Sequence, residues 1–433
     1  MSAGAARDEH RGAGAHPAGW RAAAAGGVER ARGRPPLQRG PSARLPDAGA
    51  ARQASIDVFR GLTIAVMVFV NQLAGVAGVP AWARHLPGDV DGMSFVDGVF
   101  PAFLFIVGLS LPFALRQRVQ RGDDAAALVR HVLARTAGLM VLGLFMVNAE
   151  EGYAAQRMAW PVAAWALAAY VCAYAVWGVY AGARVHLWRL AGVGGLLLLF
   201  AAYRGSAGEG AGMTAQWWGI LGLIGWAYGV AAAGCLAFGD RVSGQVGVVV
   251  ACFALYALAH SSLGGAWAVA QPLLDQADAL VHGAITACGV VTALLLFDRR
   301  QPARACVFAL LLAAAGVALR PLYPVSKIHA SPSWCCFSAA ACVALAVALH
   351  ALLDVGEGGQ RRARALRWLA PVAAQPLVTY LLPYVVDALM TLAGIGWMPA
   401  LRSGALGVAA CVAWTAAMLA LATGVTRRIR LQL

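Results

Sequence analysis

Hydrophobic runs alternate with short polar loops along nearly the whole chain from Ile56 onward. Each run is long enough to cross a hydrocarbon core of roughly 30 Å as about 20 helical residues. The pattern predicts an all-α, polytopic membrane bundle of about ten to twelve transmembrane helices. The twelve candidate segments are 57–79, 98–115, 132–148, 159–181, 188–203, 217–238, 245–260, 279–297, 304–320, 334–353, 369–393 and 404–425.

Arginine is concentrated in every second loop, and this bias orients the bundle. Loops on the cytoplasmic side of a membrane carry an excess of Lys and Arg. We therefore expect both termini to be cytoplasmic and the loops around His85 and Lys327 to lie on the opposite side. The arginines of this pattern are Arg52, Arg60, Arg116, Arg118, Arg121, Arg130, Arg135, Arg184, Arg189, Arg299, Arg300, Arg304, Arg361, Arg362, Arg364, Arg367, Arg427, Arg428 and Arg430.

Composition supports the membrane assignment. Of the 433 residues, 60% are hydrophobic and 12% charged, which is far from the average soluble domain. The net charge of +14 does not indicate nucleic-acid binding, because the arginines lie between apolar runs and form no stripe. The nine cysteines lack C-x-x-C spacing, so no disulfide framework and no metal site is predicted.

The chain divides into a tail and one membrane domain. Residues 1–51 are rich in Ala, Gly, Arg and Pro and show no helical or strand period, which predicts a disordered cytoplasmic tail. A start codon assigned upstream of the true one is the alternative. Residues 52–433 are predicted to form a single transmembrane domain. We find no internal repeat, which weakens a secondary transporter built from repeated units.

The first apolar run carries polar residues at both of its ends. Asp57 and Arg60 stand at its cytoplasmic edge, and Asn71 follows about 14 residues, or roughly 20 Å, further along. A polar side chain at that depth is expected to face protein or a watery cavity. The alternative is that Asn71 only hydrogen-bonds a neighbouring helix.

His85 and Asp97 flank the loop before the second apolar run. A neutral imidazole held by a carboxylate is the usual arrangement for a general base, or for a nucleophile that accepts an acyl group. Two alternatives remain open: His85 is an idle loop residue, and Asp97 only caps the following helix. Asp89 and Asp91 are interpreted as part of a solvated, glycine-rich turn.

A few polar residues stand outside these groups. Lys327 is the only lysine among the 34 Lys and Arg residues and lies in an outside loop. It is interpreted as an acceptor contact, as the ion-pair partner of a carboxylate such as Asp97, or as an unengaged loop charge. Asp387 lies within an apolar run and receives no role. Three further histidines are expected to be hydrogen-bonded packing residues: His260, His282 and His350.

Several segments together resemble the heparan-alpha-glucosaminide N-acetyltransferase family, specifically its bacterial relatives of unknown function. They are "SIDVFRGLTIAVMVFVN", a following histidine, "DGVFPAFLFIVGLSLPFAL", "SKIHASPSW" and "QPLVTYLLP". The resemblance extends from about residue 52 to the C-terminus and is most specific in the first blocks. It implies a multi-helix membrane enzyme that takes acetyl from cytoplasmic acetyl-CoA and delivers it to a terminal glucosamine on the far side.

The resemblance also implies site residues. The active-site histidine of the family lies between the first two core helices, where His85 lies, and the family's asparagine in the first of those helices matches Asn71. Two features depart from the animal members: His85 is followed by "LPGDVDG" where they have a nearby Trp and Gly, and the large lumenal domain before the core is absent from this sequence. Both departures concern the acceptor sugar.

The chemistry of acyl transfer suggests how the residues divide. Coenzyme A is polyanionic, so its nucleotide is expected at the cytoplasmic mouth, held by arginines. The pantetheine arm would reach Asn71 and His85, and the acceptor would approach from outside. The residues predicted to bind the donor are Arg52, Arg60, Arg116 and Arg135, and those predicted to contact the acceptor are Asp57 and Lys327.

Two catalytic roles of His85 remain open at the level of sequence. It could accept the acetyl group covalently, or it could deprotonate the acceptor amine or hydroxyl. In both, Asp97 would hold the imidazole and the Asn71 amide would stabilise the tetrahedral oxyanion.

Two other functions compete with acyl transfer. A transporter or flippase for a sugar or glycan would use Asn71, His85 and Asp97 to bind substrate or protons. A non-catalytic assembly factor is the third interpretation. The expected surroundings are a lipid bilayer, without nucleic acid or metal, and a homodimer is compatible with them. Arginine-rich, GC-biased coding and the lack of a signal peptide favour a bacterial inner membrane.

Overall fold

The fold is a polytopic helical membrane bundle, seen in a computed structural model that describes residues 53–180, 182–262 and 271–431. Arg52 and the predicted tail, residues 1–51, lie outside the described residues. The longer helices are α1 (Ala54–Leu73), α2 (Phe95–Gln120), α3 (Ala125–Glu150), α4 (Val162–Trp177), α5 (Val185–Ala202), α6 (Gly219–Phe238), α7 (Val242–Ala259), α9 (Ala277–Ala293), α10 (Pro302–Leu319), α11 (Pro332–Leu353), α14 (Pro376–Leu392) and α15 (Gly404–Val425).

Short helices join the long ones. A π-helical turn over Leu294–Asp298 extends α9. The other short elements are η1 (Ala81–Ala83), α8 (Gln271–Leu274), α12 (Gly356–Ala365), η4 (Arg367–Leu369), α13 (Ala370–Ala374) and η5 (Pro399–Arg402). Within the described ranges, ten helices are long and apolar enough to cross a membrane, and α13 with α14 would add one bent span. The helix α4 is apolar but shorter.

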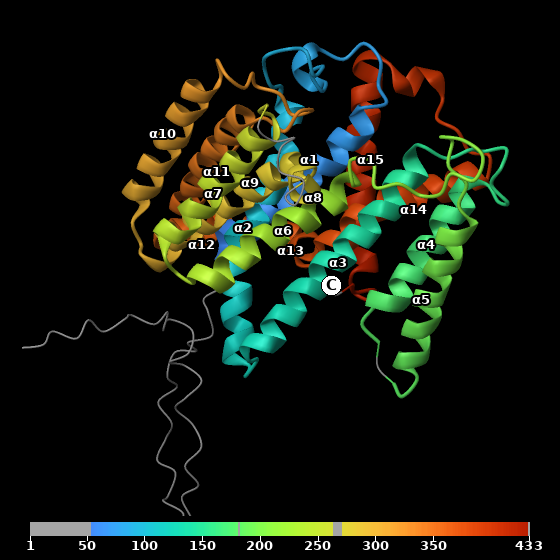
Figure 1. Ribbon diagram of the computed structural model, residues 1–433, viewed down its shortest axis with the longest axis horizontal. Helices are drawn as coiled ribbons and strands as arrows, with labels where there is room; N and C mark the ends of the chain where they lie inside the picture. Colours follow the sequence, from blue (N-terminus) through green and yellow to red (C-terminus); the bar gives the residue numbers. More distant parts are fainter. Residues whose placement is uncertain (1–52, 181, 263–270, 432–433) are drawn as a thin grey trace, which may run out of the picture.

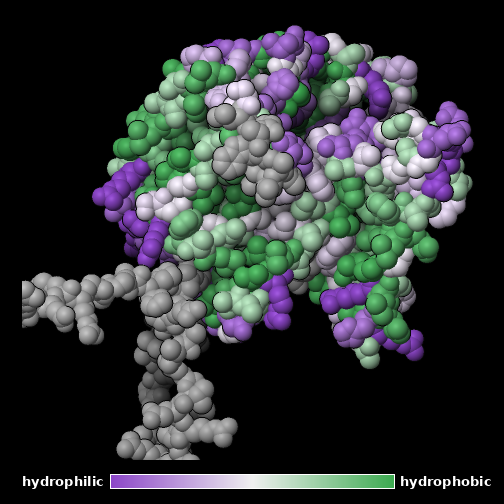
Figure 2. All heavy atoms as spheres, viewed as in Figure 1, coloured by the Kyte–Doolittle hydropathy of each residue, from purple (hydrophilic) through white to green (hydrophobic). Residues whose placement is uncertain are grey.

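The loops gather at two ends of the bundle. In Figure 1 the loop between α1 and α2 lies at the top of the view, the α2–α3 turn lies at the bottom, and the C-terminus lies in the lower half. We call the end with the α2–α3 turn and Arg427–Arg430 the basic end, and the end with loops 74–94 and 320–331 the histidine end. Figure 2 shows hydrophilic residues gathered at the upper rim, with extensive apolar surface below it.

The helix α9 is the centre of the core. It packs against α2, α6, α7 and α11, and 94% of its span is buried, compared with 17% for α5 and for α10. The backbones of α2 and α9 approach each other closely at Gly108. A Cβ on Gly108 would lie 1.8 Å from the Thr286 carbonyl oxygen of α9. Apolar residues on the outer helices instead face the surroundings, as expected for a chain in lipid.

Several predicted segments differ from the observed helices in their ends, and local sequence explains two of the differences. The segment expected at 132–148 begins at Ala125, because Asp124 caps the helix by accepting a hydrogen bond from the Ala127 N–H. The segment expected at 369–393 is broken at Gln375, where α13 and α14 meet at 81°. Pro376 lacks an N–H and disfavours helical geometry in the residue before it, so the break follows from local sequence.

Candidate active site

The histidine end is organised by the start of α2. Ser94 and Asp97 form a capping box: the Asp97 N–H donates to Ser94 Oγ, and Asp97 Oδ2 accepts from the Ser94 N–H at 2.9 Å. The other oxygen, Oδ1, lies 2.7 Å from Nδ1 of His85. The Asp97 side chain is 2% exposed and that of His85 38% exposed. Asp97 therefore both caps α2 and holds the His85 imidazole, two roles that the sequence had offered as alternatives.

Lys327 joins this pair from a distant part of the chain. Its Nζ lies 3.3 Å from both ring nitrogens of His85. Burial lowers the pKa of Lys327, and the nearby Asp97 carboxylate partly opposes that effect. Of the interpretations open from sequence, the unengaged loop charge is therefore wrong, because the ammonium group stands against the imidazole.

A clasp between two loops places Lys327 there. Asp91 Oδ1 accepts a hydrogen bond from the Val325 N–H at 2.8 Å, and Asp91 Oδ2 pairs with Nε of Arg320 at 2.9 Å. The Gly92 N–H donates back to the Val325 carbonyl at 2.9 Å. These interactions, first that with Val325 and then that with Arg320, lower the pKa of Asp91. Asp91 is exposed in a turn, as expected, and its carboxylate also binds a loop more than two hundred residues away, which the sequence did not predict.

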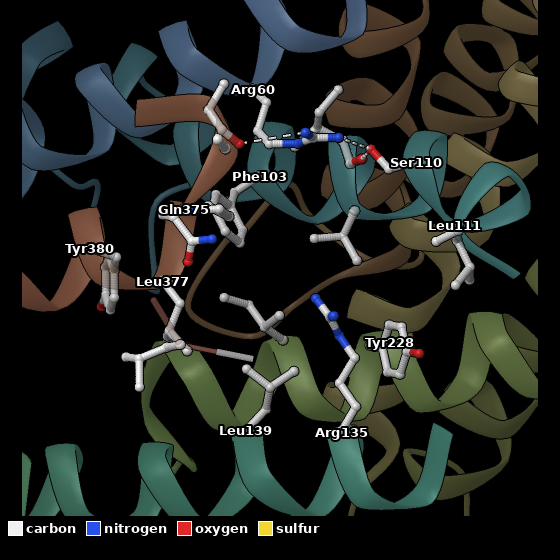
Figure 3. Close-up of a pocket in the computed structure, with 18 of the residues that line it drawn as sticks. Arg60, Phe103, Ser110, Leu111, Arg135, Leu139, Tyr228, Gln375, Leu377 and Tyr380 are labelled. Atoms are coloured by element: carbon white, nitrogen blue, oxygen red, sulfur yellow. Dashed lines mark hydrogen bonds between the residues drawn. The ribbon is translucent and has the colours of Figure 1, made fainter. Parts of the chain in front are cut away.

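A cavity of about 500 Å³ enters the bundle among α1, α2, α3, α6 and α14. Figure 3 shows Arg60 and Arg135 reaching into it from opposite sides, with the Gln375 amide between. Arg135 lies unusually far along its helix for an arginine at the basic end, because it is ten residues, or about 15 Å, past the start of α3. The basic side chains that line the cavity are Arg60, Arg118, His131, Arg135 and Arg430.

The two deep arginines differ in how they are held. Arg60 donates to Ser110 Oγ at 2.6 Å and to the Ala373 carbonyl at 3.5 Å. Arg135 stacks over the Tyr228 ring, with its guanidinium carbon 5.0 Å from the ring centroid. Its Nε is buried and has no hydrogen-bond partner among the described residues. A buried donor of this kind is expected to have an acceptor, so the cavity suits an anionic ligand.

Two tyrosines connect the cavity with Asn71. Tyr380 lines the cavity, and its hydroxyl lies 3.0 Å from that of Tyr384, one turn along α14. The Tyr384 hydroxyl accepts a hydrogen bond from Asn71 Nδ2 at 3.4 Å. The alternative interpretation of Asn71, a hydrogen bond to a neighbouring helix, is thus realised, and it places the amide at one end of a polar chain that begins in the cavity.

Comparison with known proteins matches the first part of this architecture. Residues 52–206 match a family model described as a domain of unknown function, DUF5009. The chain is 34% identical over 100 residues to the heparan-alpha-glucosaminide N-acetyltransferase of Mus musculus, and 34% identical over 98 residues to that of Homo sapiens. The matches cover 23% and 22% of this chain and 14% of each relative. The DUF5009 segment contains Asn71, His85, Asp97 and the two deep arginines.

Two predicted residues are not brought to the sites expected for them. Arg116 does not line the cavity, because its guanidinium pairs with Asp240 at 2.8 Å and with Asp298. Asp57 lies in the first turn of α1 and pairs with Arg60 at 3.5 Å, at the end of the bundle away from Lys327. Asp57 and Lys327 therefore cannot contact one acceptor together. Arg52 lies outside the described residues.

Sequence reasoning overlooked part of the cavity lining. Arg430 was interpreted only as a topology signal, and Tyr380 received no role. For Tyr380 a signal existed, because it lies in the "QPLVTYLLP" segment that carries part of the family resemblance. Among the described residues, no group of three or more His, Cys, Asp or Glu side chains could hold a metal ion.

Proposed function

We propose that this protein is a membrane acyltransferase that moves an acetyl group from acetyl-CoA, bound at the basic end, to an amine or hydroxyl of glucosamine or a related glycan at the histidine end. One observation carries the proposal: a histidine held by a buried carboxylate stands at one end of α1 and α2, and an arginine-lined cavity enters between these helices towards the other. The partial similarity to an N-acetyltransferase supports the same reaction class.

The cavity suits the acyl donor. Arg60 and Arg135, with Arg118 and Arg430, offer charged donors to the phosphates of coenzyme A. A volume of about 500 Å³ lies within the usual range for small-molecule sites. The pantetheine arm would follow the polar chain from Tyr380 to Asn71, which brings the thioester towards the histidine end. Gln375, at the break between α13 and α14, would meet the arm on the way.

Two mechanisms use the same residues. In one, Nε2 of His85 attacks the thioester carbonyl, coenzyme A leaves as the thiolate and takes up a proton, and the acceptor then removes the acetyl group from the ring. In the other, His85 takes the proton of the acceptor as the acceptor attacks the thioester directly, and coenzyme A leaves as the thiolate, which His85 then protonates. Asp97 orients the ring through Nδ1 in both. The Asn71 amide would donate to the oxyanion in place of Tyr384.

The proposed orientation follows from the distribution of arginine. We place the basic end in the cytoplasm, where acetyl-CoA is found, with both ends of the chain on that side. The glycan acceptor then meets His85 and Lys327 from the extracytoplasmic face. A bacterial inner membrane is the location that we propose.

The test is transfer by purified protein in detergent, with labelled acetyl-CoA as donor and glucosamine as acceptor. Wild type should form labelled product, and His85→Ala should lose at least about 100-fold of the rate because it lacks the catalytic base or nucleophile. His186→Ala is the matched control, since His186 is exposed in the first turn of α5. Full transfer by His85→Ala would remove the central assignment.

A transporter is the second candidate, and the broken span favours it. Helices interrupted near the middle of the membrane often form substrate sites in transporters, and α13 and α14 meet at 81° beside the cavity. Covalent transfer in detergent requires no sealed compartment, whereas transport does. Uptake of labelled sugar into sealed proteoliposomes, with no acetylated product in detergent, would support the transporter.

A further inference from the structure

The Asp97 carboxylate has two candidate counter-charges. It is buried, and a buried carboxylate is costly unless a cation balances it. One candidate is a protonated His85 ring, whose Nδ1 is 2.7 Å away. The other is the ammonium group of Lys327, whose Nζ lies 3.3 Å from both nitrogens of the same ring. A single carboxylate needs only one of them.

We propose that Lys327 balances the charge of Asp97 and thereby keeps His85 an uncharged free base in the resting protein. The inference rests on the proposed function, because a free base is what either mechanism needs at the start of the cycle. Lys327 acts here through His85, so it is a positioning residue, and contact with the acceptor is not required of it.

The positions of the three groups favour this division of charge. In a neutral ring, Nδ1–H donates to Asp97. Lys327 Nζ is 3.3 Å from both ring nitrogens, so the ammonium group stands over the ring and not along the Nε2 lone pair. A protonated ring would place a second positive charge directly against the ammonium group. Two cations at this separation would repel each other.

Lys327 is held in this position by its own loop. The Ala330 N–H donates to the Lys327 carbonyl at 3.1 Å, and the clasp of Asp91 with Arg320 and Val325 closes the loop onto the segment after His85. Among the described residues, no other ionisable side chain makes a hydrogen bond or ion pair with the ring. The remaining ionisable side chains of the elements that surround the site are Arg84, Asp89, His260, Asp278, His282 and His329.

The test combines a pH profile with a direct measure of the charge on the ring. In Lys327→Met, His85 should become the counter-charge of Asp97, so transfer at pH 7 should fall about 10-fold or more and recover as the pH is raised by one to two units. Lys327→Arg should keep the wild-type profile. A loss that is equal at every pH would show that Lys327 only contacts the acceptor or supports the loop, and would overturn the inference.

A second readout does not depend on activity. With ¹⁵N-labelled histidine, assigned by comparison with His85→Gln, the ring nitrogens should report a mainly neutral His85 in wild type at pH 7 and a mainly protonated one in Lys327→Met. A neutral ring in both proteins would overturn the inference even if transfer occurs. If wild type shows no transfer but the ring changes its charge, the proposed function fails and the electrostatic role of Lys327 stands.

Arg84→Gln is the matched charge control. It removes one exposed positive charge next to His85 in sequence and leaves the Lys327 contact in place. It should change neither readout. A shift as large as that of Lys327→Met would assign the effect to general surface charge and overturn the specific role of Lys327.

Discussion

At the scale of single residues, Asp97 combines a structural and a chemical role. One carboxylate oxygen completes the cap of α2 and the other holds His85. One carboxylate can do both because the third residue of a helix points its side chain back toward the free N–H groups of the first turn. The imidazole is therefore oriented by the same interaction that begins the helix, which fixes its position relative to the bundle.

Asp97→Asn separates these roles. The amide retains an oxygen that can accept from the Ser94 N–H, but it removes the charge that holds the ring. We expect transfer to fall about 100-fold or more, with little change in Tm. Ser94→Ala is the complementary control, because it removes only the hydroxyl that accepts from Asp97 N–H and should cost about 1 kcal/mol of stability with the rate largely kept. Equal rates for Asp97→Asn and wild type would contradict the role.

At the scale of elements, the bundle depends on helices whose backbones approach closely. The contact of α2 with α9 is closest at Gly108, which faces the backbone of Thr286. Small residues at such points allow helices in a membrane to gain van der Waals contact that larger side chains would prevent. Because α2 carries Asp97 at its start and Ser110 in the cavity, this contact also sets the relation between the two ends of the site.

Gly108→Ala should disrupt that contact. The added methyl group would lie 1.8 Å from a backbone oxygen, which cannot move without shifting α9. We expect a loss of about 1–3 kcal/mol of stability, measured as a lower Tm in detergent. Gly247→Ala on α7 is the control, because its added methyl group would meet no atom of another described residue within 4 Å and alanine favours helix. Unchanged Tm for Gly108→Ala would show that the helices do not pack this closely.

The clasp between the two loops should respond to pH. The folded state lowers the pKa of Asp91 below the usual value of about 3.9, because the ionised carboxylate accepts hydrogen bonds from Val325 and Arg320. The ionised Asp91 carboxylate therefore stabilises the fold at any pH above its usual pKa, and this stabilisation is lost as the pH falls through the lowered pKa of the folded state. We expect the Tm difference between wild type and Asp91→Asn to be largest near pH 7 and to shrink below about pH 4. Asp89→Asn, exposed in the same loop, should show no such difference.

At the scale of the whole molecule, the site has two ends joined by shared helices. The basic end offers buried cationic donors to an anion, and the histidine end offers an imidazole to an acceptor. The bent pair α13 and α14 lies beside the cavity, and its Ala373 carbonyl receives Arg60. Irregular backbone at this depth is tolerated only where it is buried in protein or lines a cavity, which is what the break does.

Donor affinity should depend on the deep arginines. Arg60→Gln and Arg135→Gln each remove a charged donor, and we expect the KM for acetyl-CoA to rise about 10-fold with a smaller change in kcat. Arg304→Gln removes one exposed charge at the same end of the bundle and should leave KM unchanged. A fall in kcat with constant KM would indicate that the arginines serve folding or chemistry instead of donor binding.

The sequence by itself determined the features that depend on local order along the chain. Apolar runs of membrane-spanning length predicted the helical bundle, which the structure confirms. The His85–Asp97 pair was also within reach, because only 12 residues separate its members and one of them begins a helix. Local geometry fixes such pairs, so residue spacing carries the information.

Tertiary structure alone decided which distant residues meet. Lys327 reaches His85 across 242 positions, and Asn71 and Arg60 reach α14 and α13 across 313. The same packing placed Arg116 among aspartates and left Arg135 in the cavity, although both are arginines near the basic end. Sequence could not separate them, because the direction in which a side chain faces depends on how each helix rotates and tilts against its neighbours.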